Sequence, residues 1–176
     1  MNLKKVLLGG LVVVSAISLT GCKKINTENI EKKNVETNKK VSETTKNETI
    51  ENLQLIDSNI LLTSLGLEVE DVSDYVGKIP VYNRAEGTMY VAIKPAKNKK
   101  DKVKRALELY VSDLESKLTD LRTEEEKKEE NEEEKRKAEE LKLLKALKKE
   151  EYKGYFIYVS GKNTDQIMKI LKERVK

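Results

Sequence analysis

The residue types in this chain decide which chemistry it can carry. Among its 176 residues there is no histidine, and Cys22 is the only cysteine. Without histidine no Ser-His-Asp arrangement can form, and one thiol alone provides neither a zinc site nor an activated nucleophile. The sequence also lacks a P-loop and a dinucleotide-binding glycine fingerprint. We therefore expect no metal site and no cofactor.

Carboxylates are the remaining candidates for catalysis. Asp71, Asp74 and Glu86 lie near the ends of expected strands, and two carboxylates held close together can act as general acid and base. Nothing in the sequence fixes their separation, so we expect no catalytic residue. A carboxylate-dependent hydrolase ranks last among the function hypotheses.

A concentration of cations is the main candidate binding feature. It lies where an expected strand leads into an expected helix, and cations at a helix N-terminus oppose the helix dipole. One interpretation is attraction to anionic lipid headgroups or an acidic wall polymer; the other is a solvated lysine-rich loop. No aromatic residues interleave with the cations, so nucleic acid is not an expected partner. The cations are Lys97, Lys99, Lys100, Lys102, Lys104 and Arg105, preceded by Lys94.

The seven tyrosines are expected to pack on the sheet with their hydroxyls at its rim. The alternative is a ligand-stacking surface, which would suit a ligand-binding protein.

The N-terminus has the layout of a signal peptide. Lys4 and Lys5 precede an apolar run over residues 6–19. This run of about 14 residues is shorter than the roughly 20 that a membrane-spanning helix needs. Small residues and Cys22 follow it. The alternative interpretation is an uncleaved anchor with an incidental thiol.

The tetrapeptide Leu19-Thr20-Gly21-Cys22 resembles the lipobox of bacterial lipoproteins. The resemblance implies a diacylglyceryl group on the Cys22 sulfur, cleavage before Cys22, and attachment to the extracytoplasmic face of the cell membrane. Two acyl chains anchor a protein stably, whereas one does so only marginally.

Composition divides the rest of the chain into two parts. Residues 22–48 are rich in Lys, Asn, Thr and Glu, so they are predicted to be a disordered tether with a reach of about 30 Å. Residues 49–176 are predicted to form a single α+β domain, in which about three strands are packed with amphipathic helices.

Periodicity and turn residues locate the expected elements. Gly66 is expected to end the first helix. Asn98 is expected to cap the second helix, and Asn163 is expected to cap the last one in a capping box with Gln166. Pro80 predicts that its strand lies at a sheet edge, and apolar residues on both faces predict that the next strand is internal. The expected helices cover residues 50–65, 98–121 and 163–175, and the expected strands cover residues 75–82, 88–94 and 155–160.

A charged excursion over residues 123–150 begins with TEEEKKEENEEEKRK. A continuous helix from residue 98 to 152 would be roughly 80 Å long and would separate the last strand from the other two. The sequence therefore favours a helical hairpin over a dimer that exchanges its last strand and helix. The charged run itself is expected to be a solvated helix or an irregular excursion.

Three segments resemble a family of bacterial lipoproteins whose domain has no assigned function. They are DVSDYVGKIPVYN (71–83), MYVAIKPAKNKKDKVKRAL (89–107) and YKGYFIYVSGKNTDQI (152–167). The resemblance implies an envelope location and a small α+β domain, and it supplies no catalytic residues. The chain departs from the family between residues 123 and 150.

These observations favour a lipid-anchored, non-catalytic binding module of the cell envelope. Its expected partners are the membrane, through Cys22, and an envelope protein or anionic polymer. The alternative is a small-ligand-binding accessory lipoprotein.

Overall fold

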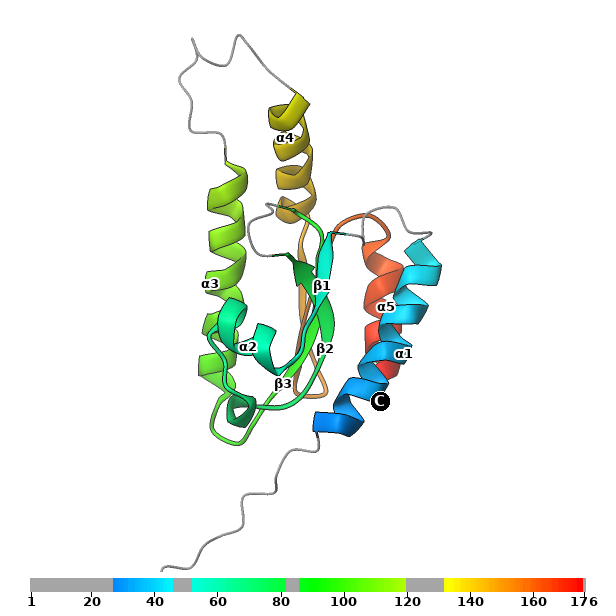
Figure 1. Cartoon of the computed structure of the whole chain (residues 1–176), viewed down its shortest axis with the longest axis vertical. Helices are drawn as coiled ribbons and strands as arrows, with labels where there is room; N and C mark the ends of the chain where they lie inside the picture. The colour runs from blue at the N-terminus through cyan, green and yellow to red at the C-terminus, as the bar shows by residue number, and fades with distance from the viewer. Residues whose placement is uncertain (1–26, 46–51, 82–85, 120–131, 176) are drawn as a thin grey trace, which may run out of the picture.

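A computed structural model describes residues 27–45, 52–81, 86–119 and 132–175. Cys22 and the predicted signal peptide lie outside these residues. The described chain forms a five-stranded antiparallel sheet in the order β1-β2-β3-β5-β4 with helices on both faces (Figure 1). The predicted α+β class is confirmed, but two strands were missed. The strands are β1 (Leu53–Leu55), β2 (Val72–Pro80), β3 (Met89–Pro95), β4 (Lys148–Tyr152) and β5 (Tyr155–Ser160).

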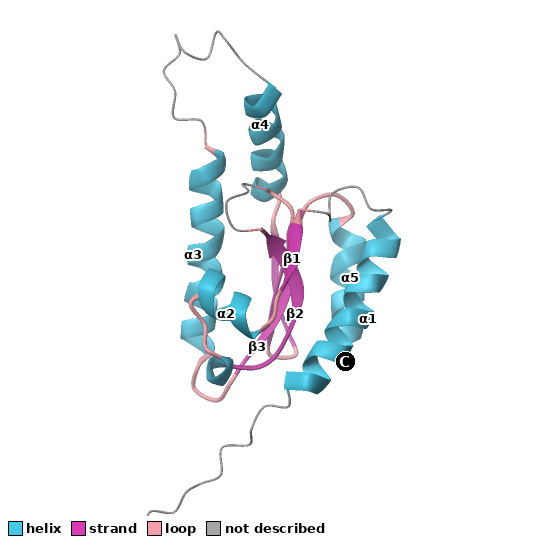
Figure 2. Cartoon of the chain, viewed as in Figure 1, coloured by secondary structure: helices cyan, strands magenta, loops and turns pink. Residues whose placement is uncertain are grey.

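The helices form two outer layers (Figure 2). One layer contains α2 (Ser58–Leu65), α3 (Lys100–Leu118) and α4 (Glu132–Lys145), and the other contains α1 (Thr27–Thr45) and α5 (Thr164–Arg174). A short 3-10 helix, η1 (Val69–Asp71), leads into β2. Each layer has its own core, because alternate residues of the sheet point to opposite faces.

Strand β3 is the centre of the sheet, as its apolar residues on both faces predict. Residues 89–93 are all buried. Gly77 of β2 permits the close pairing with β3, since a Cβ at this position would lie 2.2 Å from the Tyr90 carbonyl oxygen. The hairpin of β4 and β5 then completes the sheet on the other side of β3.

The prediction that Pro80 marks a sheet edge was wrong. Strand β1 pairs with β2 beyond it, with Leu53 opposite Pro80. The missing N–H of proline is tolerated because Pro80 is the last residue of β2, and its carbonyl accepts a hydrogen bond of 3.1 Å from the Gln54 side chain.

The helix predicted from residue 50 begins only at Ser58. The Asp57 carboxylate caps it by accepting a hydrogen bond of 2.8 Å from the Ile60 N–H. Residues 53–55 form β1 instead, since a three-residue strand leaves no periodicity to detect. Gly66 ends α2 in the left-handed conformation, as predicted.

The disordered tether predicted over residues 22–48 needs correction, because residues 27–45 form α1. This helix packs on β2 and α5. Its inward stripe carries Ile30 and Val41 together with buried Asn34, Thr37 and Asn38. Composition alone indicated a tether because polar residues occupy most of this inward stripe.

The predicted helical hairpin is confirmed in the described residues, where α3 and α4 lie side by side and antiparallel (Figure 1). The Glu140 carboxylate of α4 accepts a hydrogen bond of 2.6 Å from the Gly87 N–H, which fixes α4 to the sheet. The connection over residues 120–131 lies outside the described chain.

The predicted N-terminal helix caps were right only in the position of Asn163. Lys99, not Asn98, occupies the N-cap of α3, and Asn163 at the N-cap of α5 makes no side-chain hydrogen bond to it. Both asparagines adopt positive φ, so they serve as turn residues and the capping box with Gln166 does not form.

Candidate functional site

One end of the sheet collects the predicted cations. Strand β2 begins there, β3 leads into α3, and the β4–β5 turn closes there, with Val72 opposite Pro95 and Tyr152 opposite Tyr155. Helix α1 starts at this same end (Figure 1). We call it the basic end and define it by four exposed lysines: Lys94, Lys97, Lys100 and Lys153. Lys153 was not predicted, since it joins the others only through the β4–β5 turn.

Two of the six predicted cations have a structural role. Lys99 and Lys102 form ion pairs of 3.0 and 2.5 Å with Asp71, whose side chain is 1% exposed. The Glu68 N–H also donates to Asp71, at 2.9 Å. Burial disfavours the charged carboxylate, but the hydrogen bonds from Lys102, Lys99 and Glu68 outweigh burial and lower the pKa of Asp71 to about 2. These two lysines therefore fix η1 to α3.

The other predicted cations remain exposed. Lys100 forms an ion pair of 2.7 Å with exposed Glu151, and Lys104 forms one of 3.9 Å with Glu108. Lys97 and Arg105 form no ion pair with any residue that the structure describes. Exposed ion pairs contribute little to stability, so these charges are available to an external anion.

Aromatic rings support lysines at the basic end. The Lys94 ammonium lies 5.4 Å from the centroid of the Tyr155 ring, and that of Lys153 lies 5.7 Å from the Tyr152 ring. Contacts of this length are cation–π interactions. Tyr75, Tyr90, Tyr155 and Tyr158 are buried, as the packing interpretation predicted. Burial raises the pKa of Tyr75 to about 12.

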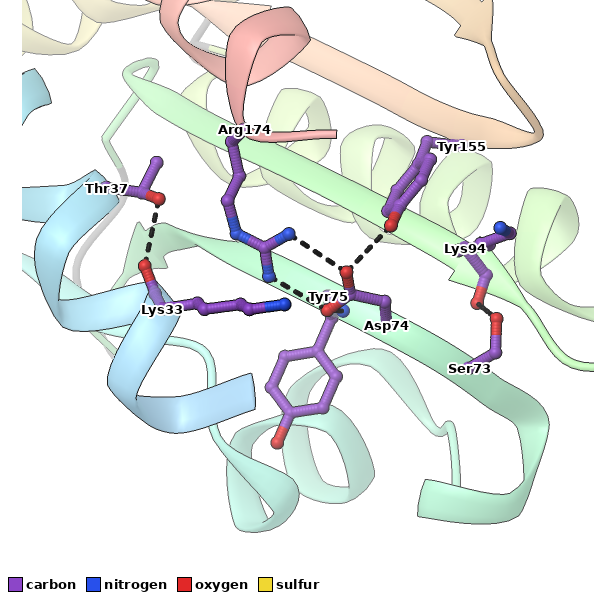
Figure 3. Close-up of polar contacts among 8 residues, drawn as sticks. All are labelled: Lys33, Thr37, Ser73, Asp74, Tyr75, Lys94, Tyr155 and Arg174. Atoms are coloured by element: carbon purple, nitrogen blue, oxygen red, sulfur yellow. Dashed lines mark hydrogen bonds and ion pairs between the residues drawn. The ribbon is translucent and has the colours of Figure 1, made fainter. Parts of the chain in front are cut away.

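A largely buried ion pair lies beside the basic end (Figure 3). Both terminal nitrogens of Arg174 bind the Asp74 carboxylate, at 3.0 Å each, and the Tyr155 hydroxyl donates to the same carboxylate at 2.7 Å. The side chains of Arg174 and Asp74 are 10% and 18% exposed. Burial and this hydrogen bond to Asp74 raise the pKa of Tyr155. The cluster joins the end of α5 to β2 and β5.

No local pattern in the sequence indicates the role of Arg174. Its partner is 100 residues away, and an arginine in the last turn of a helix is ordinary. Only the fold brings the two together.

The candidate catalytic carboxylates are engaged separately. Asp71 binds Lys99 and Lys102, Asp74 binds Arg174, and Glu86 binds Arg136 at 3.2 Å. Each is thus held by its own cation, which gives no support to an acid–base pair. The described residues contain no cluster of three or more potential metal ligands.

A pocket of about 130 Å³ lies between α1 and α5. This volume is below the roughly 300–1,000 Å³ of typical small-molecule sites. The lining residues are Lys33, Glu36, Thr37, Lys40, Ile170, Glu173 and Arg174.

Comparison with protein-family models, curated proteins and solved structures gives no match to this chain. The resemblance to the lipoprotein family therefore stays a prediction. Within the described ranges, no helix has the length and apolar character needed to cross a membrane.

Proposed function

We propose that this chain is a lipid-anchored, non-catalytic binding module of the cell envelope. Its Cys22 lipid and its basic end hold the domain against the anionic membrane surface. The α3–α4 hairpin, which projects from the other end of the sheet, faces an envelope partner. The observation that carries this proposal is the start of α1 at the basic end, while α3 and α4 extend beyond the opposite end (Figure 1).

The distance between anchor and domain is short. Only residues 23–26 separate Cys22 from the first residue of α1. At about 3.5 Å per residue, this segment can span at most roughly 18 Å. A lipid on Cys22 would therefore keep the start of α1, and with it the basic end, close to the headgroups.

Electrostatics favours this orientation. Each lysine near an anionic membrane surface contributes about 1 kcal/mol, and the attraction decays over a Debye length of about 8 Å at physiological salt. Lys94, Lys97 and Lys153 are suited to this contact, and Lys100 contributes less because it pairs with Glu151. Lys99 and Lys102 contribute less, because buried Asp71 already binds both ammonium groups.

Charge reversal at the basic end tests the proposal. In the mature chain from residue 22 without lipid, Lys97→Glu combined with Lys153→Glu is expected to weaken binding to phosphatidylglycerol vesicles more than tenfold. Co-sedimentation with vesicles measures this, and neutral phosphatidylcholine vesicles give the background. Neither lysine pairs with a carboxylate of the described chain, and Lys153→Glu loses only an exposed contact with the Tyr152 ring, so folding should be little affected.

The matched control is Lys142→Glu combined with Lys145→Glu, two exposed lysines in the last turn of α4 at the opposite end of the sheet. It carries the same change in net charge and should bind nearly as the parent does. Equal losses in both double variants would show that net charge, and not the basic end, governs binding. An unchanged affinity in the first variant would overturn the proposal outright.

A further inference from the structure

Helix α1 buries a polar face. Asn34, Thr37 and Asn38 are 3%, 5% and 4% exposed, and only Ile30 and Val41 add buried apolar side chains. Its neighbour α5 instead buries Ile167, Met168 and Leu171. Because apolar burial is the main force that holds a helix to a sheet, we expect α1 to be held more weakly than α5.

The polar groups beneath α1 are poorly satisfied. Both side-chain polar atoms of Asn34 and the Nδ2 of Asn38 are buried without a hydrogen-bond partner in the described chain. From this stripe, Asn38 Oδ1 accepts a hydrogen bond of 2.8 Å from the Tyr90 hydroxyl of the sheet. The Thr37 hydroxyl donates back to the Lys33 carbonyl at 2.9 Å, within α1 itself. Unpaired buried polar groups favour the undocked state, where water satisfies them.

The seam between α1 and α5 is also loosely packed. The pocket of about 130 Å³ lies between them, and Lys33, Glu36 and Lys40 of α1 line it. Figure 3 shows Lys33 and Thr37 on the α1 side of Arg174, whose Nε is buried without a partner. Apart from Ile30 and Val41, the residues of α1 that face β2 and α5 are therefore polar or line a pocket, and they add little apolar packing.

We propose that α1 is a releasable strap that undocks from β2 and α5 while the sheet and the other helices stay folded. Helix α1 lies between Cys22 and the rest of the domain, so its release would lengthen the connection between them. This consequence rests on the proposed lipid at Cys22. With α1 docked, residues 23–26 separate the anchor from the domain; with α1 released, residues 23–52 do. The reach then grows from at most roughly 18 Å to an r.m.s. distance of about 30 Å. The strap thus switches the domain between a membrane-held and an extended position.

Hydrogen exchange of the full chain in detergent micelles tests the release itself, with or without lipid on Cys22. The amides of α1 are expected to exchange about 100-fold faster than those of α5, because they open without global unfolding. Exchange of α1 as slow as that of α5 would overturn the proposal.

Filling the polar seam should hold the strap down. Asn34→Leu removes both unpaired groups and adds apolar contact, so α1 amides are expected to exchange about tenfold more slowly, with α5 unchanged. Asn34→Ala, which adds no volume, should shift exchange in the same direction if leucine overfills the site. The matched control is Val35→Asn, because Val35 is 61% exposed on the same helix. If neither Asn34 variant slows α1, or if Val35→Asn slows it as much, the strap proposal fails.

A second readout separates this proposal from the membrane function. A fluorophore on Lys142→Cys, with the Cys22 thiol blocked by its lipid, reports energy transfer to a dye in the vesicle. Asn34→Leu should raise the transfer by shortening the mean distance. If Asn34→Leu slows the exchange of α1 but no variant shows energy transfer, the lipid anchor is contradicted and the strap is supported. If energy transfer is efficient but Asn34→Leu leaves it unchanged, release of α1 does not change the distance between the domain and the membrane.

Discussion

Replacing Arg174 with methionine is expected to lower the free energy of unfolding by about 3 kcal/mol, the lower end of the cost of removing one partner of a buried ion pair, because the Asp74 side chain keeps 18% of its surface exposed. The substitution leaves the Asp74 carboxylate with only the Tyr155 hydroxyl as a side-chain donor among the contacts described. It also detaches the last turn of α5 from β2. Urea unfolding followed by circular dichroism gives the free energy directly.

Two further variants show whether the loss arises from an unpaired charge. Asp74→Asn combined with Arg174→Met removes both charges and should recover a large part of the lost stability. Lys117→Met breaks an exposed pair, Lys117–Asp113, whose side chains are 48% and 57% exposed, and should change stability by less than about 0.5 kcal/mol. A loss below about 1 kcal/mol in Arg174→Met would show that the pair does not fix α5.

Acid is expected to remove about 2 kcal/mol of stability through Asp71 alone. The pKa of this carboxyl is about 2 in the folded protein and 3.8 for an ordinary aspartate, and each unit of difference corresponds to about 1.4 kcal/mol. A pKa lowered by folding contributes stability that is complete above pH 4 and is lost as the pH falls through 2. Urea unfolding at intervals between pH 5 and 2 measures it.

The variant Asp71→Asn isolates this contribution from the other carboxyl groups. It should be less stable than the parent at pH 5, and the difference should shrink as the pH approaches 2. Parallel stability curves over this range would mean that Asp71 ionises alike in the folded and unfolded chains.

Local patterns in the sequence predicted the elements that local physics determines. The strands around Val91 and Ile157 follow from short apolar runs rich in aromatic and β-branched residues, and the end of α2 follows from the left-handed geometry of Gly66. Strand β4, KKEEY, was not predicted because its charged residues show no apolar pattern. Such residues suit the edge of a sheet, and only pairing with β5 makes this segment a strand.

The candidate site was predicted only where its residues are close together in the sequence. The cation cluster is visible in a short stretch of sequence. Which of its lysines bind Asp71 and which stay exposed could not be predicted, since Asp71 lies far from Lys99 in the chain. Arg174 and Lys153 meet the site only through α5 and the β4–β5 turn. Helix α1 was not predicted because asparagines at its buried positions interrupt the helical periodicity of apolar residues.

Lysine labelling of the lipidated protein tests the membrane-held orientation most directly. The protein is placed on phosphatidylglycerol vesicles or in detergent, treated with a soluble amine-reactive reagent, and mapped by mass spectrometry. On vesicles, Lys97 and Lys153 are expected to label several-fold more slowly than in detergent, while Lys142 and Lys145 label equally in both. The Cys22→Ala variant should not acquire the lipid. Equal labelling of all four lysines on vesicles and in detergent would contradict the proposal that the basic end faces the membrane.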